Sequence, residues 1–110
     1  MSSKSRHYSS PPKNAQEAEN SKHQGNLLFQ KQKYAAACEL YTEAILQSEQ
    51  KWHVPYLNRA MANEKRLRWK EAKEDLEKCL KLDHDNVKAT YHLGVCVCML
   101  PEEIEDNYKK

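Results

Sequence analysis

Small residues recur in this chain at a nearly constant interval, and this repetition limits the folds open to it. The two glycines, Gly25 and Gly94, lie 35 residues before and 34 residues after Ala60. Four more positions repeat at an interval of 35: Tyr34 and Trp69, Ala37 and Ala72, Tyr41 and Leu76, Ala44 and Cys79. A repeat of this length indicates a stacked array in which each unit buries its apolar face against the next.

Each repeated unit has the composition and the apolar spacing of two helices. The chain is 39% hydrophobic and 31% charged, with only 2 glycines and 4 prolines to form turns. In residues 34–47 the apolar positions follow the three-four spacing of one buried helical stripe. These patterns predict an all-α chain with helices at 15–30, 34–47, 53–66, 69–82 and 86–100, and a sixth that starts at Pro101 and runs through 102–110. Paired, they give hairpins at about 15–48, 53–83 and 86–110.

Three of the predicted helix starts carry local signals. Asn14 is followed three residues later by Glu17, which is the spacing of a capping box. Pro55 falls in the first turn of the third helix, where its missing N–H costs nothing. Asp85 is predicted to cap the fifth helix through its side-chain oxygen.

The first 14 residues differ from the rest, because they are Ser, Pro and basic residues with almost nothing apolar. We expect them to form a disordered tail before a helical domain at 15–110. Ser10-Pro11 fits a proline-directed phosphorylation site, but we favour an unmodified tail. The tail has no apolar stretch of the kind that signals secretion. The longest apolar run, residues 93–100, is too short to span a bilayer.

Composition also argues against several classes of function. The formal net charge of +2 gives no electrostatic reason to expect a nucleic-acid or membrane partner. The basic stretch at 66–73 contains one tryptophan but is followed directly by acidic residues, which favours a solvated helix face over a nucleic-acid patch. The scattered histidines form no catalytic constellation with Ser or Cys. We therefore expect a cytoplasmic protein without catalysis or cofactor.

The four cysteines are predicted to be buried thiols in a reducing compartment rather than a disulfide framework. Cys96 and Cys98 lie two residues apart, so they point to different sides of a helix. No second Cys/His pair has the spacing of metal ligands, and we expect no metal site. The cysteines in question are Cys38, Cys79, Cys96 and Cys98.

A helix-turn-helix unit of about 34 residues with recurring small and aromatic positions resembles the tetratricopeptide repeat. The resemblance covers about residues 15–100 and is strongest in the first two units. In the third unit the first helix fits well, whereas the second places Asp106 where the earlier units have alanine. The resemblance implies a short right-handed superhelix of about two and a half hairpins.

In tetratricopeptide arrays the first helix of each hairpin lines a concave groove. Here that groove would present Lys22 and Asn26, then Asn58, then Lys88, whose ammonium and amide groups are suitable donors to carboxylates. The segments K-H-Q-G-N, Y-L-N-R-A and N-V-K-A resemble the carboxylate-clamp subclass of these domains. This resemblance implies a co-chaperone that binds the free C-terminal tail of cytosolic heat-shock chaperones, Glu-Glu-Val-Asp.

Within that subclass, Q-G-N-L-L-F, N-R-A-M and V-K-A-T-Y-H-L-G are similar to the chaperone-binding domain of a co-chaperone ubiquitin ligase. By this resemblance Lys65 is a further candidate contact of the tail. His92 occupies a position where adaptor-type clamps carry arginine and the ligase carries an aromatic residue, and it is a candidate contact too. An apolar pocket for the tail would be formed by Phe29, Val54, Met61 and Tyr91.

We favour a non-catalytic adaptor for chaperone tails and keep two alternatives. The first is the targeting part of a ubiquitin ligase, whose partners would include the ubiquitination machinery. The second is a scaffold for an internal peptide or a folded partner. The two lysines also have a plainer interpretation. Lys22 lies three residues after Glu19, and Lys88 lies three residues after Asp85, so each could simply pair with its neighbour.

Overall fold

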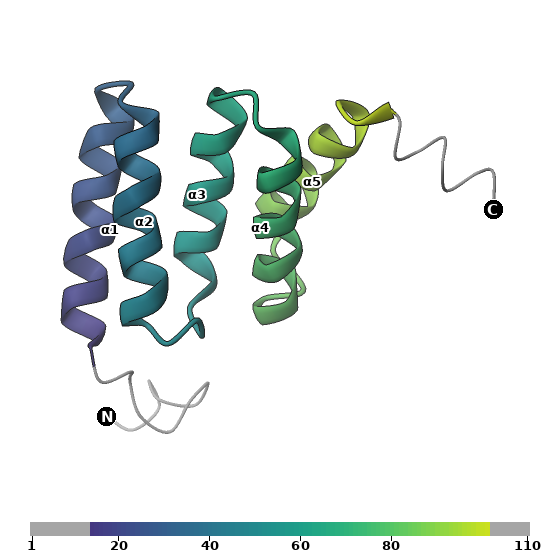
Figure 1. The fold of residues 1–110 in the computed structure, drawn as a ribbon. Coiled ribbons are helices and arrows are strands. Elements are labelled where there is room, and N and C mark those ends of the chain that lie inside the picture. Colours follow the sequence, from purple (N-terminus) through teal and green to yellow (C-terminus); the bar gives the residue numbers. More distant parts are fainter. Residues whose placement is uncertain (1–13, 102–110) are drawn as a thin grey trace.

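The computed structural model describes residues 14–101, and these form five helices connected by short loops (Figure 1). Antiparallel hairpins are formed by the first and second helices and by the third and fourth, and the fifth packs against the second hairpin. The first helix also contacts the third, and the third contacts the fifth. The odd-numbered helices therefore run along one side of the stack. The helices are α1 (Ala15–Gln30), α2 (Tyr34–Gln47), α3 (His53–Lys65), α4 (Trp69–Leu82) and α5 (Val87–Cys98).

Apolar periodicity predicted the existence of all five helices and most of their bounds. The predicted and observed ranges of α1, α2 and α4 coincide, while α3 ends one residue earlier than predicted, at Lys65. The predicted range of α5 was too long at both ends, since the helix spans 87–98 rather than 86–100. The disordered tail with Ser10-Pro11 was predicted for a segment outside the described residues. The predicted sixth helix with Asp106 also lies outside them, except for its first residue, Pro101, which is helical.

Two of the predicted caps were wrong. Asn14 precedes α1, but its backbone is not extended and its side chain makes no capping hydrogen bond, so the capping box with Glu17 does not form. The cap of α5 is Asn86, not Asp85. Asn86 has an extended backbone, and its Oδ1 accepts a hydrogen bond from the backbone N–H of Ala89 at 2.8 Å.

The core consists of two clusters along the stack. One cluster belongs mainly to the first hairpin and is built on the fully buried ring of Tyr41. The other extends from Ile45 through α3 and α4 to α5 and includes the fully buried Leu76. The small residues of the repeat are completely buried where helices meet, as predicted, because they let the backbones approach closely: Ala37, Ala44, Ala60 and Ala72.

The repeated glycine position has two different structural roles. At Gly25 an added Cβ would lie 2.6 Å from Cε1 of Tyr41, so only glycine lets this ring lie against α1. At Gly94, which is exposed, an added Cβ would meet no described atom within 4 Å beyond its chain neighbours and the adjacent backbone of α5. The close approach that the sequence predicted is therefore present in the first hairpin.

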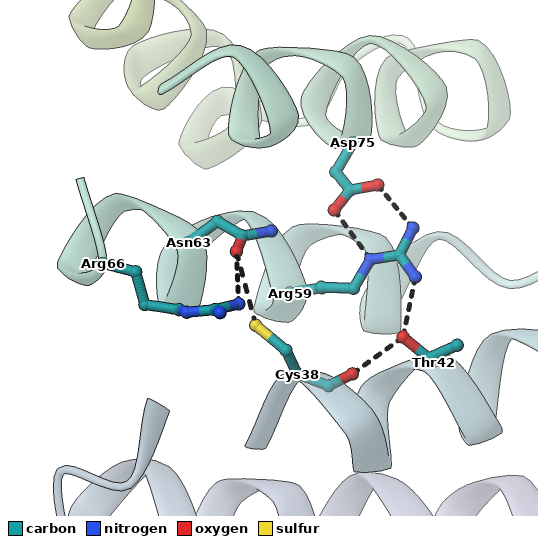
Figure 2. A network of polar contacts seen from close by, with 6 residues as sticks. All are labelled: Cys38, Thr42, Arg59, Asn63, Arg66 and Asp75. Carbon is teal, nitrogen blue, oxygen red and sulfur yellow. Dashed lines mark hydrogen bonds and ion pairs between the residues drawn. The ribbon is translucent and has the colours of Figure 1, made fainter. Parts of the chain in front are cut away.

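An ion pair within the second hairpin is linked by a hydrogen bond to the first hairpin (Figure 2). Arg59 of α3 donates to both carboxylate oxygens of Asp75 of α4, each at 2.8 Å, and its Nη1 donates to Thr42 Oγ1 of α2 at 2.9 Å. The hydrogen bond from Arg59 to Asp75 raises the pKa of the Arg59 guanidinium. One side chain on α3 thus holds both neighbouring second helices, which fixes α3 within the stack.

The glycine pair predicts stability changes of opposite sign. We expect Gly25→Ala to lower the free energy of unfolding by about 1–2 kcal/mol, because overpacking costs about 1–3 kcal/mol and better helix propensity returns only about 1 kcal/mol. We expect Gly94→Ala to raise it by about 0.5–1 kcal/mol, from propensity alone. Urea unfolding followed by circular dichroism measures both. A loss of stability at Gly94 equal to that at Gly25 would contradict this assignment.

The ion pair predicts a large effect of Asp75→Ala. Breaking a buried pair leaves an unpaired charge, which typically costs about 3–5 kcal/mol. Because the Arg59 side chain is 24% exposed and water can hydrate it, we expect a loss of about 2–4 kcal/mol. The control is Glu71→Ala, which removes an exposed pair with Arg68 and should change stability by less than about 0.5 kcal/mol. Similar unfolding midpoints for the two variants would contradict the role of Asp75.

Candidate functional site

The contact between α1 and α3 brings together two asparagines that are 32 residues apart in the sequence. The side-chain Nδ2 of Asn58 donates to Oδ1 of Asn26 at 3.5 Å. The same oxygen accepts a hydrogen bond from the hydroxyl of Tyr41, on α2, at 2.6 Å. Three helices therefore meet at one amide group, and both asparagines predicted as tail contacts lie at that point.

A pocket of about 180 Å³ opens beside these amides. Asn26 and Asn58 supply its polar wall, and Phe29 and Met61 supply apolar surface. Two of the four predicted apolar residues thus line it. The other two, Val54 and Tyr91, are not among its lining residues, which are Asn26, Phe29, Gln30, Tyr41, Asn58 and Met61.

Lys22 lies on α1 one helical turn before Asn26 and therefore on the same face of the helix. Its Nζ is 3.3 Å from a carboxylate oxygen of Glu19, so the plain ion pair considered from the sequence is present. Its Nζ also lies 5.5 Å from the ring centroid of Trp52, in a cation–π contact. The side chain is only 18% exposed, which means that its position is set by packing as well as by charge.

Two further candidate lysines are exposed, and they lie at opposite ends of two helices that run in the same direction (Figure 1). Lys65 is in the last turn of α3 and Lys88 is in the first turn of α5. Neither forms an ion pair within residues 14–101, so the pairing of Lys88 with Asp85 is not seen.

His92 is turned toward a carboxylate of α3. Its Nδ1 lies 3.0 Å from each carboxylate oxygen of Glu64, and the Sγ of Cys96 donates to the same group at 3.7 Å. Tyr91 packs edge-on against the His92 ring at a centroid distance of 5.2 Å and is largely exposed. The candidate contacts His92 and Tyr91 therefore lie together on α5, with the histidine held by Glu64.

Sequence reasoning missed three residues that shape these contacts. Tyr41 was assigned to the core, although its hydroxyl also bonds Asn26. A buried tyrosine usually finds a hydrogen-bond partner, which was the available signal. Glu64 stands at the repeat position of Phe29 and Cys98, so a charge at an otherwise apolar position could have revealed it. Trp52, in the loop before α3, carried no signal of its contact with Lys22.

Comparison with known proteins identifies the fold. No protein-family model matches the chain. Over 87 residues it is 40% identical to the E3 ubiquitin-protein ligase CHIP of Arabidopsis thaliana, a match that covers 77% of this chain and only 30% of that protein. The chain is therefore much shorter than this curated relative.

Solved structures match over most of their length. The second TPR of Spaghetti (RPAP3), bound to the HSP90 peptide SRMEEVD, superposes with a TM-score of 0.78 at 30% identity, covering 89% of this chain and 92% of that one. The second TPR domain of human RPAP3, in complex with the HSP70 peptide SGPTIEEVD, gives a TM-score of 0.76 at 31% identity, covering 82% and 74%. The chain belongs to the tetratricopeptide repeat family.

In this tetratricopeptide domain, α1, α3 and α5 are the first helices of successive hairpins, and α2 and α4 are second helices. The asparagine pair lies where two first helices meet, as the resemblance implied. None of the described helices is long and apolar enough to cross a membrane.

A second pocket, of about 270 Å³, lies over the polar network of α2, α3 and α4 (Figure 2). Its arginines face an equal number of acidic residues, and its inner polar groups bond one another. For example, Asn63 Oδ1 accepts from Arg66 Nη1 at 3.2 Å and from Cys38 Sγ at 3.5 Å. We assign this pocket to the hairpin contact of the tetratricopeptide domain rather than to a ligand.

The cysteines fit a structural role, with one correction. Cys38, Cys79 and Cys96 are buried as predicted, but Cys98 is exposed because it lies on the outer side of α5. Burial raises the pKa of the Cys79 thiol to about 11, and burial together with the nearby Glu64 carboxylate raises the pKa of Cys96 to about 12. Within residues 14–101 no group of three His, Cys, Asp or Glu side chains could hold a metal ion.

These thiols predict selective labelling. In the folded domain a thiol reagent at neutral pH should modify Cys98 alone, because buried thiols with a raised pKa carry little thiolate. In denaturant all four cysteines should react. Mass spectrometry of the labelled chain counts the adducts, and Cys98→Ser should leave the native protein unlabelled. Rapid native labelling of Cys79 or Cys96 would contradict the buried arrangement.

Proposed function

We propose that this domain is a co-chaperone module that binds the free C-terminal tail of cytosolic heat-shock chaperones, Glu-Glu-Val-Asp, along α1, α3 and α5. The observation that carries the proposal is the meeting of the Asn26 and Asn58 amides, from two different hairpins, in one pocket with Lys22 one turn away. The structural neighbours from RPAP3 hold peptides that end in this sequence. The site would act in the cytoplasm and would bind without catalysis.

The chemistry of the groove suits a terminal aspartate, which carries two carboxylates. Lys22 would pair with these carboxylates, and the two asparagine amides would donate hydrogen bonds to them. Breaking the ion pair between Lys22 and Glu19 would cost little free energy. Glu19 is 45% exposed, and exposed ion pairs contribute little to stability. Trp52 would keep the lysine in place during this exchange.

The remaining contacts would extend along the groove. Phe29 and Met61 line the pocket and would receive the valine side chain of the tail. Lys65 and Lys88 would pair with the preceding acidic residues of the tail. Val54, Tyr91 and His92 would complete the contacts, with the hydrogen bond to Glu64 limiting the freedom of the histidine.

The number of contacts sets the scale of the affinity. A charge-assisted hydrogen bond contributes about 1.5–3 kcal/mol net. Four or five such bonds, less the cost of ordering a flexible tail, give roughly −6 to −9 kcal/mol. This corresponds to a Kd in the micromolar range, within about an order of magnitude or two.

Similarity to CHIP favours a second, wider function. In a longer protein the same groove would serve as the chaperone-targeting part of a ubiquitin ligase, with the ubiquitination machinery as a further partner. The full-length transcript decides this, because a ligase domain encoded after the helical region would support the wider function and its absence would remove it.

Calorimetric titration with the peptide SRMEEVD tests the clamp. We expect a micromolar Kd for the wild type and at least about tenfold weaker binding for Lys22→Ala and for Asn58→Ala, since each loses a charged hydrogen bond. The control is Lys81→Ala, which removes an exposed lysine of α4 away from the groove. Unchanged affinity in both groove variants would remove the assignment.

The same titration separates the clamp from a scaffold that binds internal peptides. Amidation of the peptide C-terminus removes one carboxylate, so affinity should collapse, and added salt should weaken binding by screening the charges. Equal affinity for the free and the amidated peptide, or an affinity that does not change with salt concentration, would favour the scaffold.

A further inference from the structure

The side-chain oxygen of Asn26 accepts two hydrogen bonds. It accepts the hydroxyl of Tyr41 at 2.6 Å and the Nδ2 of Asn58 at 3.5 Å. The oxygen and nitrogen of an asparagine amide lie on opposite sides of one planar group, so holding the oxygen also orients the nitrogen. A flipped amide would set its NH₂ against the NH₂ of Asn58, leaving two donors facing each other. The two donors together therefore select one orientation.

The hydroxyl of Tyr41 is not required by the packing of the repeat. Leu76 occupies the equivalent position of the second hairpin and is fully buried there. Apolar filling is thus achieved without a hydroxyl. At the glycine position the two hairpins differ as well, with Gly25 in the first and Ala60 in the second. Glycine is needed only where the larger tyrosine ring lies against α1.

The tyrosine is also in the correct protonation state to act as a donor. Its ring is almost completely inaccessible, and burial raises the pKa of Tyr41 to about 12. The hydroxyl therefore keeps its proton at neutral pH. Its short contact with Asn26 is the hydrogen bond that this buried hydroxyl makes within residues 14–101.

We infer that the Tyr41 hydroxyl is a positioning group of the groove: it fixes the Asn26 amide so that its NH₂ faces the carboxylate of a bound tail. This inference rests on the proposed function and adds a residue on a second helix, α2, to a site made of first helices. Tyr41 acts through Asn26 and does not itself touch the peptide.

The test is a double-mutant cycle with the peptide SRMEEVD. Tyr41→Phe keeps the ring against Gly25 and removes only the hydroxyl. We expect it to weaken binding about fivefold to tenfold in the wild-type background, the effect of one lost hydrogen bond. In an Asn26→Ala background the same change should alter the affinity less than about twofold, because the group that it orients is gone.

The matched control is Tyr56→Phe, which removes another buried phenol hydroxyl, in the second hairpin, and should leave the affinity unchanged. Unaltered binding by Tyr41→Phe would overturn the inference, and so would an equal loss in both backgrounds, which is the behaviour of a general structural effect. Absence of binding by the wild type would instead overturn the proposed function, and this inference with it.

Discussion

Contact between α1 and α3 is the constraint on which the site depends. Asn26 and Asn58 belong to different hairpins, and no local preference of either helix could bring their amides within 3.5 Å. Only the stacking of one hairpin on the next does so. The groove is therefore a property of the array, and each helix alone would carry a donor without a partner.

The repeat supplies a common framework that individual positions then use differently. The lack of a side chain at Gly25 makes room for the Tyr41 ring. At Gly94 an added Cβ would meet no such neighbour from another described helix. Tyr41 carries a hydroxyl to the groove where Leu76 only fills space. The repeat pattern therefore predicts where helix backbones approach each other. Departures from the pattern indicate where a packed side chain also carries a polar group.

The sequence determined most of the fold in advance because helix formation and apolar spacing are local. It also placed both asparagines on first helices, through resemblance to a known family. The cap at Asn86, the exposure of Cys98 and the bond between His92 and Glu64 were not predictable in the same way. Each depends on the direction in which one helix end or one side chain points. Apolar spacing predicts which residues are buried but not that direction.

Polar contacts hold α3 on both of its sides. On one side Arg59 joins it to Thr42 and Asp75 of the two second helices. On the other, Asn58 joins it to Asn26 of the preceding first helix. Because the first set is charged and partly buried, a rotation of α3 that separated the two amides would also disturb these strong bonds. The network away from the groove therefore preorganises the groove, and the ordering cost of binding falls mainly on the flexible ligand.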